Sequence, residues 1–469
     1  MNPVKPRLVI FVMLAVGAAR AAAAQYVPID LGTLGGISSD AAAVNDSGQV
    51  VGSSFTAGNE VHAFSWTADR GIVDLGTLGG TFSHAVAVNG SGQVVGDSFT
   101  AGNAELHAFS WTADGGMVDL GTLGGGASNA VGVSNSGQVA GTSSTAGDAT
   151  IHAFLWSADQ GMVDLGTLGG PASVATAVSA SGQVVGYAMA DPNNTEITHA
   201  FSWTAVGGMV DLGMFLEGFS FSRHVSNSGQ VVGDSFLNGV ASRVFSWTPS
   251  GGMVDVGNLG GSASPAAVNE NGQVVGHSYT ENVELHAFSW TADRGMLDLG
   301  TLGGTQSTAF AVNSTGQVVG QSTTAGDAVT HAFSWTAAGG MVGLPELAVG
   351  GSGGAADVNN HGQVVGASAG HATMWVLPVT VESALDQLMA QVAAYGLPKG
   401  LTNALTAKLE AALASWQRGR RSNAAVNQIG AFIHEVDAKR GKALTDAQAD
   451  TLIRMAEIVV QAIRTDAPR

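Results

Sequence analysis

The sequence predicts a mainly β protein: an eight-bladed β-propeller closed by its N-terminal strand, followed by a small all-α helical domain. The first observation behind this is that Gly-Gln-Val-Val-Gly, or a one-residue variant, occurs eight times at intervals of 43 to 47 residues. Such a period is typical of propeller blades or stacked repeats. The others are a spare strand before the first copy and a change of composition after the last. The copies begin at Gly48, Gly92, Gly137, Gly182, Gly229, Gly272, Gly316 and Gly362.

The chain starts with the pattern of a secretory signal peptide. Lys5 and Arg7 precede an apolar run at positions 8–19, and small residues follow up to Ala24. The run of 12 is shorter than the roughly 20 residues that cross a membrane. We therefore expect residues 1–24 to be cleaved, and the mature chain to be exported to the periplasm or the extracellular medium without spanning a membrane.

Each repeat predicts four short strands. Segments of the type Ala-Val-Asn, Gln-Val-Val-Gly, His-Ala-Phe-Ser-Trp and Val-Asp-Leu-Gly are separated by Gly, Asn, Asp and Ser. The turn Asn-x-Ser-Gly-Gln, as at 45–49, favours a tight hairpin with Gly48 in the left-handed conformation. The connection between the second and third strands varies most in length, so the protruding loops are expected there.

The two ends of the array complement each other. Pro28 to Leu34 is a fourth-strand segment with no repeat before it, and the last copy ends at Trp375 with no fourth strand. A closed ring needs this arrangement and leaves few exposed sheet edges. We therefore expect residues 25–378 to be an eight-bladed propeller, with a differently closed propeller or a β-solenoid as the alternatives.

Composition excludes several classes of site. The chain has no cysteine, which removes disulfides, thiol nucleophiles and iron–sulfur clusters. Residues 25–378 hold 27 acidic and four basic residues, a net charge of −23, and this would repel nucleic acid. No cofactor, metal site or catalytic constellation is predicted.

The last ninety residues change to an Ala, Leu, Lys and Glu composition with helical spacing, as in Leu401, Leu405 and Leu409. We expect a helical domain at 379–469. The helices are predicted at 381–394, 400–416, 422–439 and 445–465.

Two resemblances follow from these motifs. The repeated His-Ala-Phe-Ser-Trp, Asp-Leu-Gly-Thr-Leu-Gly-Gly and Val-Asn-x-Ser-Gly-Gln-Val-Val-Gly segments, over about 30–378, resemble the HAF repeat of exported bacterial proteins. Residues of about 380–466, especially 427–433 (Asn-Gln-Ile-Gly-Ala-Phe-Ile), resemble the FIMAH domain, a C-terminal helical module. The resemblances imply an extracellular bacterial protein and supply no reaction.

A histidine, a tryptophan and an aspartate recur at fixed spacing in the repeats. Their composition is similar to the network that braces blades in WD-repeat propellers, so a structural role is expected rather than metal binding. The His-Trp-Asp sets in the first three copies are His62, Trp66, Asp74; His107, Trp111, Asp119; and His152, Trp156, Asp164.

The fifth copy departs most from the pattern, so it is where a ligand site is expected. Two of the body's four basic residues lie here, with aromatic residues beside them, and they favour an acidic or sugar-like ligand. Neutral drift with compensating packing is the alternative. The candidate residues are Phe215, Glu217, Phe221, Arg223, His224 and Arg243.

These observations favour a secreted, non-catalytic, monomeric propeller that acts as an interaction scaffold for an unknown protein or carbohydrate partner. The helical tail would be a docking or assembly module. The alternative is an extracellular carbohydrate-active hydrolase or lyase with its site in the fifth copy, where Glu217 is the unusual carboxylate. Weak calcium binding by acidic loops between second and third strands is a third possibility; these residues are Glu60, Glu105, Asp148, Glu281, Glu284 and Asp327.

Overall fold

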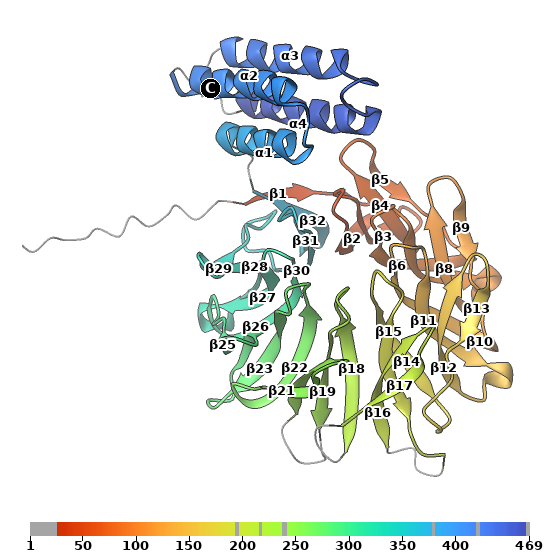
Figure 1. Cartoon of the computed structure of the whole chain (residues 1–469). Helices are drawn as coiled ribbons and strands as arrows, with labels where there is room; N and C mark the ends of the chain where they lie inside the picture. The colour runs from red at the N-terminus through yellow and green to blue at the C-terminus, as the bar shows by residue number, and fades with distance from the viewer. Residues whose placement is uncertain are drawn as a thin grey trace, which may run out of the picture. The chain divides into compact units, whose positions relative to one another are not determined.

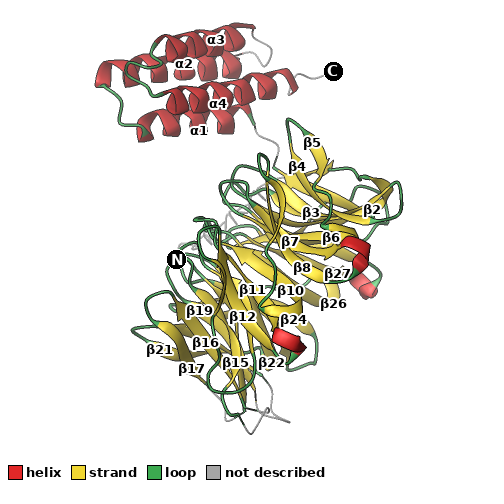
Figure 2. Cartoon of the chain, turned by 90° about the vertical axis from the view of Figure 1, so that its right-hand side faces the viewer, coloured by secondary structure: helices red, strands yellow, loops and turns green. Residues whose placement is uncertain are grey.

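The computed structural model describes residues 26–192, 197–214, 218–236, 242–377, 380–418 and 423–465. The chain divides into two compact units between Leu377 and Pro378. The first unit is built of strands and loops with only short helical turns, and the second of four long helices (Figure 2). The predicted signal peptide, residues 1–24, lies outside the described residues. None of the described helices has the length and apolar character needed to cross a bilayer.

The first unit consists of consecutive antiparallel repeats, which we number 1 to 8 along the chain. In repeat 1 the first strand pairs with the second, the second with the third and the third with the fourth. The first strands are β2 (Gly35–Val44), β6 (Gly79–Val88), β10 (Gly124–Val133), β14 (Ser173–Val178), β18 (Phe219–Val225), β22 (Gly260–Val268), β26 (Gly303–Val312) and β30 (Gly353–Val358). The second strands are β3 (Val50–Thr56), β7 (Val94–Thr100), β11 (Val139–Thr145), β15 (Val184–Met189), β19 (Val231–Phe236), β23 (Val274–Thr280), β27 (Val318–Thr324) and β31 (Val364–Ser368).

The third strands carry the His-Ala-Phe segment or its variants. They are β4 (Val61–Thr67), β8 (Leu106–Thr112), β12 (Ile151–Ser157), β16 (Thr198–Thr204), β20 (Arg243–Thr248), β24 (Leu285–Thr291), β28 (Thr330–Thr336) and β32 (His371–Val376). The fourth strands of repeats 1 to 7 are β5 (Gly71–Asp74), β9 (Gly116–Asp119), β13 (Gly161–Asp164), β17 (Gly208–Gly213), β21 (Gly252–Gly257), β25 (Gly295–Asp298) and β29 (Gly340–Gly343).

Repeat 8 takes its fourth strand from the other end of the chain. Strand β1 (Val27–Asp30) pairs antiparallel with β32, so that Val27 lies opposite Val376 and Asp30 opposite Thr373. Figure 1 shows β1 beside β32. The spare strand predicted before the first repeat is therefore used by the last one.

The Gly-Gln-Val-Val-Gly segment is explained by four local requirements. Gly48 has φ of +80°, as predicted for the hairpin. The Gln49 amide donates to the Ser65 hydroxyl at 2.9 Å, and Val50 and Val51 are fully buried. At Gly52 a Cβ atom would collide with the backbone carbonyl of Asp40 on the first strand. Each position of the motif therefore serves the scaffold.

Asparagines at the hairpin connect neighbouring repeats. The Asn45 side chain donates to the carbonyl of Asn89 in repeat 2 at 2.9 Å, and Asn313 donates to Asn359 at 2.9 Å. Asn359 of repeat 8 donates to Asn45 of repeat 1 at 3.0 Å. The joint between the last and first repeats thus has the same asparagine bond as the joints between repeats 1 and 2 and between repeats 7 and 8.

The first strands also contact one another in sequence order, and β30 contacts β2. Among the described strands no sheet closes on itself through backbone pairing. Neighbouring repeats meet through short parallel pairings, such as Val61 with Phe82, and through buried side chains, such as Phe109 of repeat 2 against Val51 and Ala63 of repeat 1. The arrangement buries apolar surface between successive repeats, which is the main source of their stability.

The second unit contains α1 (Val381–Ala394), α2 (Lys399–Arg418), α3 (Asn423–Ala438) and α4 (Asp446–Thr465). The four predicted helices are present, with ends within two residues of the expected ones. Leu405, Leu409, Trp416 and Phe432 lie in one buried apolar cluster, so the helices share a single core.

Candidate functional site

Every first strand carries a β-bulge at the same place. In repeat 1 the pairing shifts between Ala41 and Ala43, which leaves Ala42 unpaired, and the other seven first strands shift at the same position. A bulge re-aims its extra residue away from the regular ladder. The bulged residues, all of them described, are Ala42, Val86, Val131, Thr176, Arg223, Ala266, Phe310 and Ala356.

Arg223 is the charged member of this set, and it lines a cavity of about 580 Å³. The bulged residues of four consecutive repeats, 3 to 6, contribute to the cavity wall. The lining residues are Asn129, Val131, Thr142, Ile151, Val174, Ala175, Thr176, Tyr187, Arg223, His224, Pro265 and Ala266. The divergent fifth repeat thus supplies both basic side chains of this wall, Arg223 and His224.

Asp234 on the neighbouring strand fixes the Arg223 guanidinium. Nε donates to one carboxylate oxygen at 2.6 Å and Nη2 to the other at 3.3 Å. The hydrogen bond to Asp234 raises the pKa of Arg223 above its usual value, so the group stays charged. The Asp234 side chain is only 7% exposed, whereas that of Arg223 is 41% exposed. The pair holds a cation at the cavity with Nη1 left for a ligand.

One aromatic ring packs against this cation, and two more rings contact that ring. The Arg223 guanidinium carbon lies 5.4 Å from the Phe221 ring centroid, within cation–π range. Tyr187 meets Phe221 edge to face at 4.7 Å, and Phe221 stacks with Phe236 at 5.5 Å. Phe221 thus packs against the guanidinium, and Tyr187 gives the cavity wall an aromatic side chain.

His224 follows Arg223 and lines the same cavity. Its side chain keeps contact with solvent, but desolvation by the surrounding protein lowers its pKa below the usual value. His277 of repeat 6 lies near Asp234, and burial lowers its pKa as well. Both directions favour the neutral imidazole, so Arg223 is the lasting positive charge of this wall.

The other predicted ligand residues lie elsewhere. Arg243 donates from Nη1 to Asp255 at 2.6 Å, in the place where other repeats pair a histidine with an aspartate. It does not line the cavity beside Arg223. Phe215 and Glu217 lie outside the described residues. The structure thus brings together Phe221, Arg223 and His224 and separates Arg243 from them.

The repeated histidines pair with the aspartate of the following strand. Nδ1 of His62, His107 and His152 lies 2.9 Å from a carboxylate oxygen of Asp74, Asp119 and Asp164, respectively. The same aspartate accepts a backbone hydrogen bond two residues on, as from Gly76 to Asp74 at 2.8 Å. Trp66, Trp111 and Trp156 pack against apolar side chains, such as Ile72 beside Trp66, and belong to the core clusters.

Repeat 7 has Gly343 at the aspartate position, and a different acid approaches its histidine. Oε1 of Glu346 lies 4.0 Å from Nδ1 of His331, and the Glu346 carboxylate accepts a bond from Ser368. Sequence reasoning missed this replacement because Glu346 is displaced three residues along the chain. It also missed Tyr187 and Asp234, which only the register of neighbouring strands brings to Arg223.

Two of the acidic loop residues accept hydrogen bonds from the backbone of their own repeat. Asp148 and Asp327 adjoin short 3-10 turns, η2 (Ala146–Asp148) and η3 (Ala325–Asp327), and accept backbone bonds from Gly126 and Thr305, each at 2.7 Å. A similar turn, η1 (Ala101–Asn103), precedes Glu105. Among the described residues no group of three or more His, Asp or Glu side chains is arranged to hold a metal ion.

One family model matches part of the second unit. A family model described as FIMAH domain matches residues 381–461. No curated protein matches the chain.

Several solved structures resemble the chain at low identity. Virginiamycin B lyase from Staphylococcus aureus is 11% identical with a TM-score of 0.40, covering 62% of this chain and 94% of that one. The β-propeller domain of the Trilobed protease from Pyrococcus furiosus is 8% identical, with a TM-score of 0.43 and coverages of 66% and 99%. Dipeptidyl peptidase 4 from Porphyromonas gingivalis is 9% identical, with a TM-score of 0.48 and coverages of 72% and 56%. None of these likenesses supports an inference about activity.

Proposed function

We propose that this chain is an exported, non-catalytic binding scaffold: a closed eight-bladed propeller of HAF-type repeats with a helical docking or assembly module at its C-terminus. Ring closure is supported by the pairing of β1 with β32 and by the bond from Asn359 to Asn45. Export is supported by the pattern of residues 1–24, and the tail by the FIMAH match.

The observation that carries the binding function is the position of Arg223. A single guanidinium takes the bulge position that is uncharged in the other seven repeats, and a buried carboxylate orients it beside Tyr187. An oriented guanidinium next to an aromatic ring is suited to carboxylates and vicinal hydroxyls. The scaffold therefore binds an acidic or sugar-like ligand in this cavity.

A non-catalytic role agrees with the ion pairs and hydrogen bonds that the described charged side chains make within the fold. The repeated histidines and Arg243 are held by carboxylates of their own repeats, as in the pair of Arg243 with Asp255. The hydrolase or lyase alternative depends on Glu217, which is outside the described residues.

The test compares two identical substitutions in one repeat. Arg223→Lys keeps the charge beside Asp234 but loses the planar fork, and Arg243→Lys does the same outside the cavity. Thermal shift is measured against a panel of hexuronates, hexoses and dicarboxylates. Saturating ligand at a hundred times its Kd should stabilise the wild type by about 2.7 kcal/mol. We expect Arg223→Lys to lose the shift and Arg243→Lys to keep it; equal shifts in both variants contradict the proposal.

The docking role of the tail is tested by capture from culture supernatant. The full chain is compared with a chain ending at residue 378, and size-exclusion chromatography reports the oligomeric state of each. A partner or an oligomer that is lost with the tail supports the role. Identical capture and identical mass with and without the tail contradict it.

A further inference from the structure

Two further cavities are equivalent to each other and lie away from Arg223. One, of about 530 Å³, lies between repeats 1 and 2 and is lined by Gln49, Ser65, Arg70 and Trp111. The other, of about 320 Å³, lies between repeats 6 and 7 and is lined by Gln273, Ser289, Arg294 and Trp335. Each residue of the second set takes the same place in its repeat as its counterpart in the first. The same groove is thus built twice.

An arginine distinguishes these two grooves. It occupies the tip of the hairpin between the third and fourth strands, where the other hairpins of the array carry Gly115, Gln160, Gly207, Gly251 and Gly339. Both cavities therefore coincide with the two hairpins that hold an arginine. The body has four arginines and no lysine. Arg223 and Arg243 are hydrogen-bonded to carboxylates of their own sheets, which leaves Arg70 and Arg294.

The side chains of these two arginines are largely exposed, and each has a distant ion pair with the aspartate before it. The Arg70 side chain is 70% exposed, and its nearest carboxylate is the adjacent Asp69, at 3.9 Å from Nε. Arg294 is 77% exposed and lies 3.6 Å from Asp293. An exposed pair of adjacent charges contributes little to stability. Each guanidinium consequently keeps most of its donors for a ligand.

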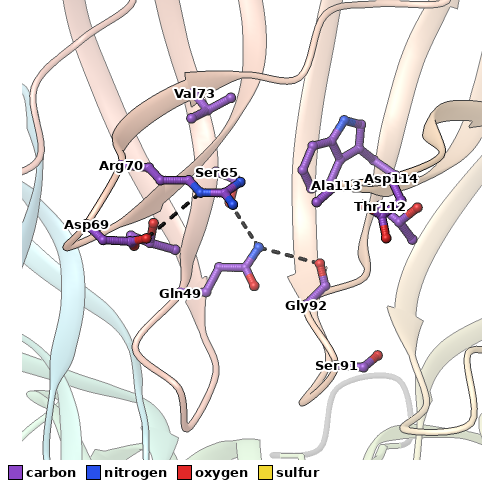
Figure 3. A pocket seen from close by; sticks show the side chains of 12 residues that line it. Gln49, Ser65, Asp69, Arg70, Val73, Ser91, Gly92, Thr112, Ala113 and Asp114 are labelled. Carbon is purple, nitrogen blue, oxygen red and sulfur yellow. Dashed lines mark hydrogen bonds and ion pairs between the residues drawn. The ribbon is translucent and has the colours of Figure 1, made fainter. Parts of the chain in front are cut away.

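The walls of the groove combine polar and aromatic groups. Figure 3 shows Arg70 and Asp69 on one wall and Thr112 and Asp114, from the next repeat, on the other, with Gln49 between them. The half-buried Trp111 completes the lining and offers part of an indole surface. The Gln49 amide, which donates to Ser65, places a polar group at the base.

This chemistry fits one class of ligand. An aromatic surface packs against the C–H face of a pyranose ring, while hydroxyl, amide and guanidinium groups bond its hydroxyls. A strongly anionic ligand fits poorly, because the body carries a net charge of −23 and, in the first groove, Asp69 and Asp114 accompany the arginine. A neutral sugar meets neither obstacle.

We propose that the two grooves at Arg70 and Arg294 are equivalent binding sites for pyranose units of a neutral polysaccharide. This inference adds a second kind of site to the scaffold proposed above and rests on that binding function. Both grooves are formed by the hairpin between the third and fourth strands of their own repeat, so they open on the same side of their repeats. One polysaccharide bound at both sites gains affinity by avidity.

The experiment uses the full chain with dextran, mannan, galactan and arabinogalactan as neutral probes, and polygalacturonate as the anionic one. Affinity electrophoresis measures retardation, and titration calorimetry with oligosaccharides of the retarding polymer measures stoichiometry. We expect two sites per chain for a neutral probe. Arg70→Ala and Arg294→Ala should each remove one site, and the double variant should weaken polymer binding at least a hundredfold.

Gln160→Ala is the matched control, since it changes the same hairpin position in a repeat without an arginine. It should leave binding unchanged, and all these exposed positions should leave Tm within about 2 °C of wild type. Failure of every neutral probe, retention by the double variant, or binding of polygalacturonate alone overturns the inference. Binding that Arg223→Lys removes but the double variant keeps upholds the proposed function and overturns this inference alone.

Discussion

The Nδ1 atom of His371 lies 3.0 Å from a carboxylate oxygen of Asp30, although the two residues are 341 positions apart. In repeat 1 the same contact joins His62 and Asp74, which are 12 positions apart, at 2.9 Å. The N-terminal strand therefore takes in repeat 8 the place of a repeat's own fourth strand. This substitution gives repeat 8 the same histidine–aspartate contact as repeat 1.

Asp97 gives the body a pH-dependent stability. Burial raises the pKa of its carboxyl from 3.8 to about 6, although the Ala130 amide donates to it at 2.9 Å. The folded chain thus holds this proton more tightly than the unfolded chain, so the contribution of Asp97 to stability is full below about pH 4 and declines as the pH rises to about 6.

Replacing the carboxylate with an amide should remove this decline. Asp97→Asn keeps an oxygen for the Ala130 amide, and we expect it to raise the free energy of unfolding at pH 7 by about 2 kcal/mol, with no gain at pH 4. Urea unfolding at both pH values measures it. Asp114→Asn on an exposed hairpin is the control; a loss of stability in Asp97→Asn at pH 7 contradicts the prediction.

The strands and helices were predictable because their signals are local. Turn residues, apolar spacing and the missing fourth strand are all visible in the sequence, and they predicted the pairing of β1 with β32. The surroundings of Arg223 were not predictable, because a bulge and the register between β18 and β19 decide that Asp234 faces it. Arg243 replaces the repeated histidine and keeps the aspartate partner, Asp255, so its place in a ligand site stays a prediction.

The pair of Arg223 and Asp234 should show strong coupling. Arg223→Met leaves a carboxylate that is 7% exposed without its cation, and such a loss costs about 2 to 4 kcal/mol. Adding Asp234→Asn removes the uncompensated charge and should recover most of that cost. A double-mutant cycle in urea measures the coupling, and simple additivity of the two changes would refute it.

The last glycine of the repeated motif should tolerate no side chain. In Gly52→Ala the new methyl group would collide with the carbonyl of Asp40, and we expect a loss of more than about 3 kcal/mol or failure to fold. Gly58→Ala is the control in the same repeat, because its Cβ would have ordinary contacts only. Melting temperatures of the two variants should differ clearly, and equal values would disprove the close approach.

Two glycines of the helical unit should respond in opposite directions. A Cβ atom would meet no other atom within 4 Å at Gly430, in α3, or at Gly396, after α1. The two glycines differ in backbone conformation, because Gly396 has φ of +58°. Gly430→Ala should stabilise the helical unit by about 0.5 to 1 kcal/mol, because alanine favours the helix. Gly396→Ala should destabilise it by about 1 kcal/mol. Thermal unfolding followed by circular dichroism at 222 nm reports both changes, and a shared sign would be inconsistent with the backbone argument.

The closure of the ring by the N-terminal strand is tested most directly by a single engineered disulfide. The chain has no cysteine, so Val27→Cys with Val376→Cys introduces one possible bond between residues directly opposite each other. We expect the oxidised variant to lose two hydrogen masses, to migrate faster on non-reducing gels, and to gain up to about 5 kcal/mol of stability by the loop-entropy relation. The control pair, Val27→Cys with Thr373→Cys, is out of register and should stay reduced. A Val27–Val376 variant that also stays reduced under mild oxidation would contradict the closed ring.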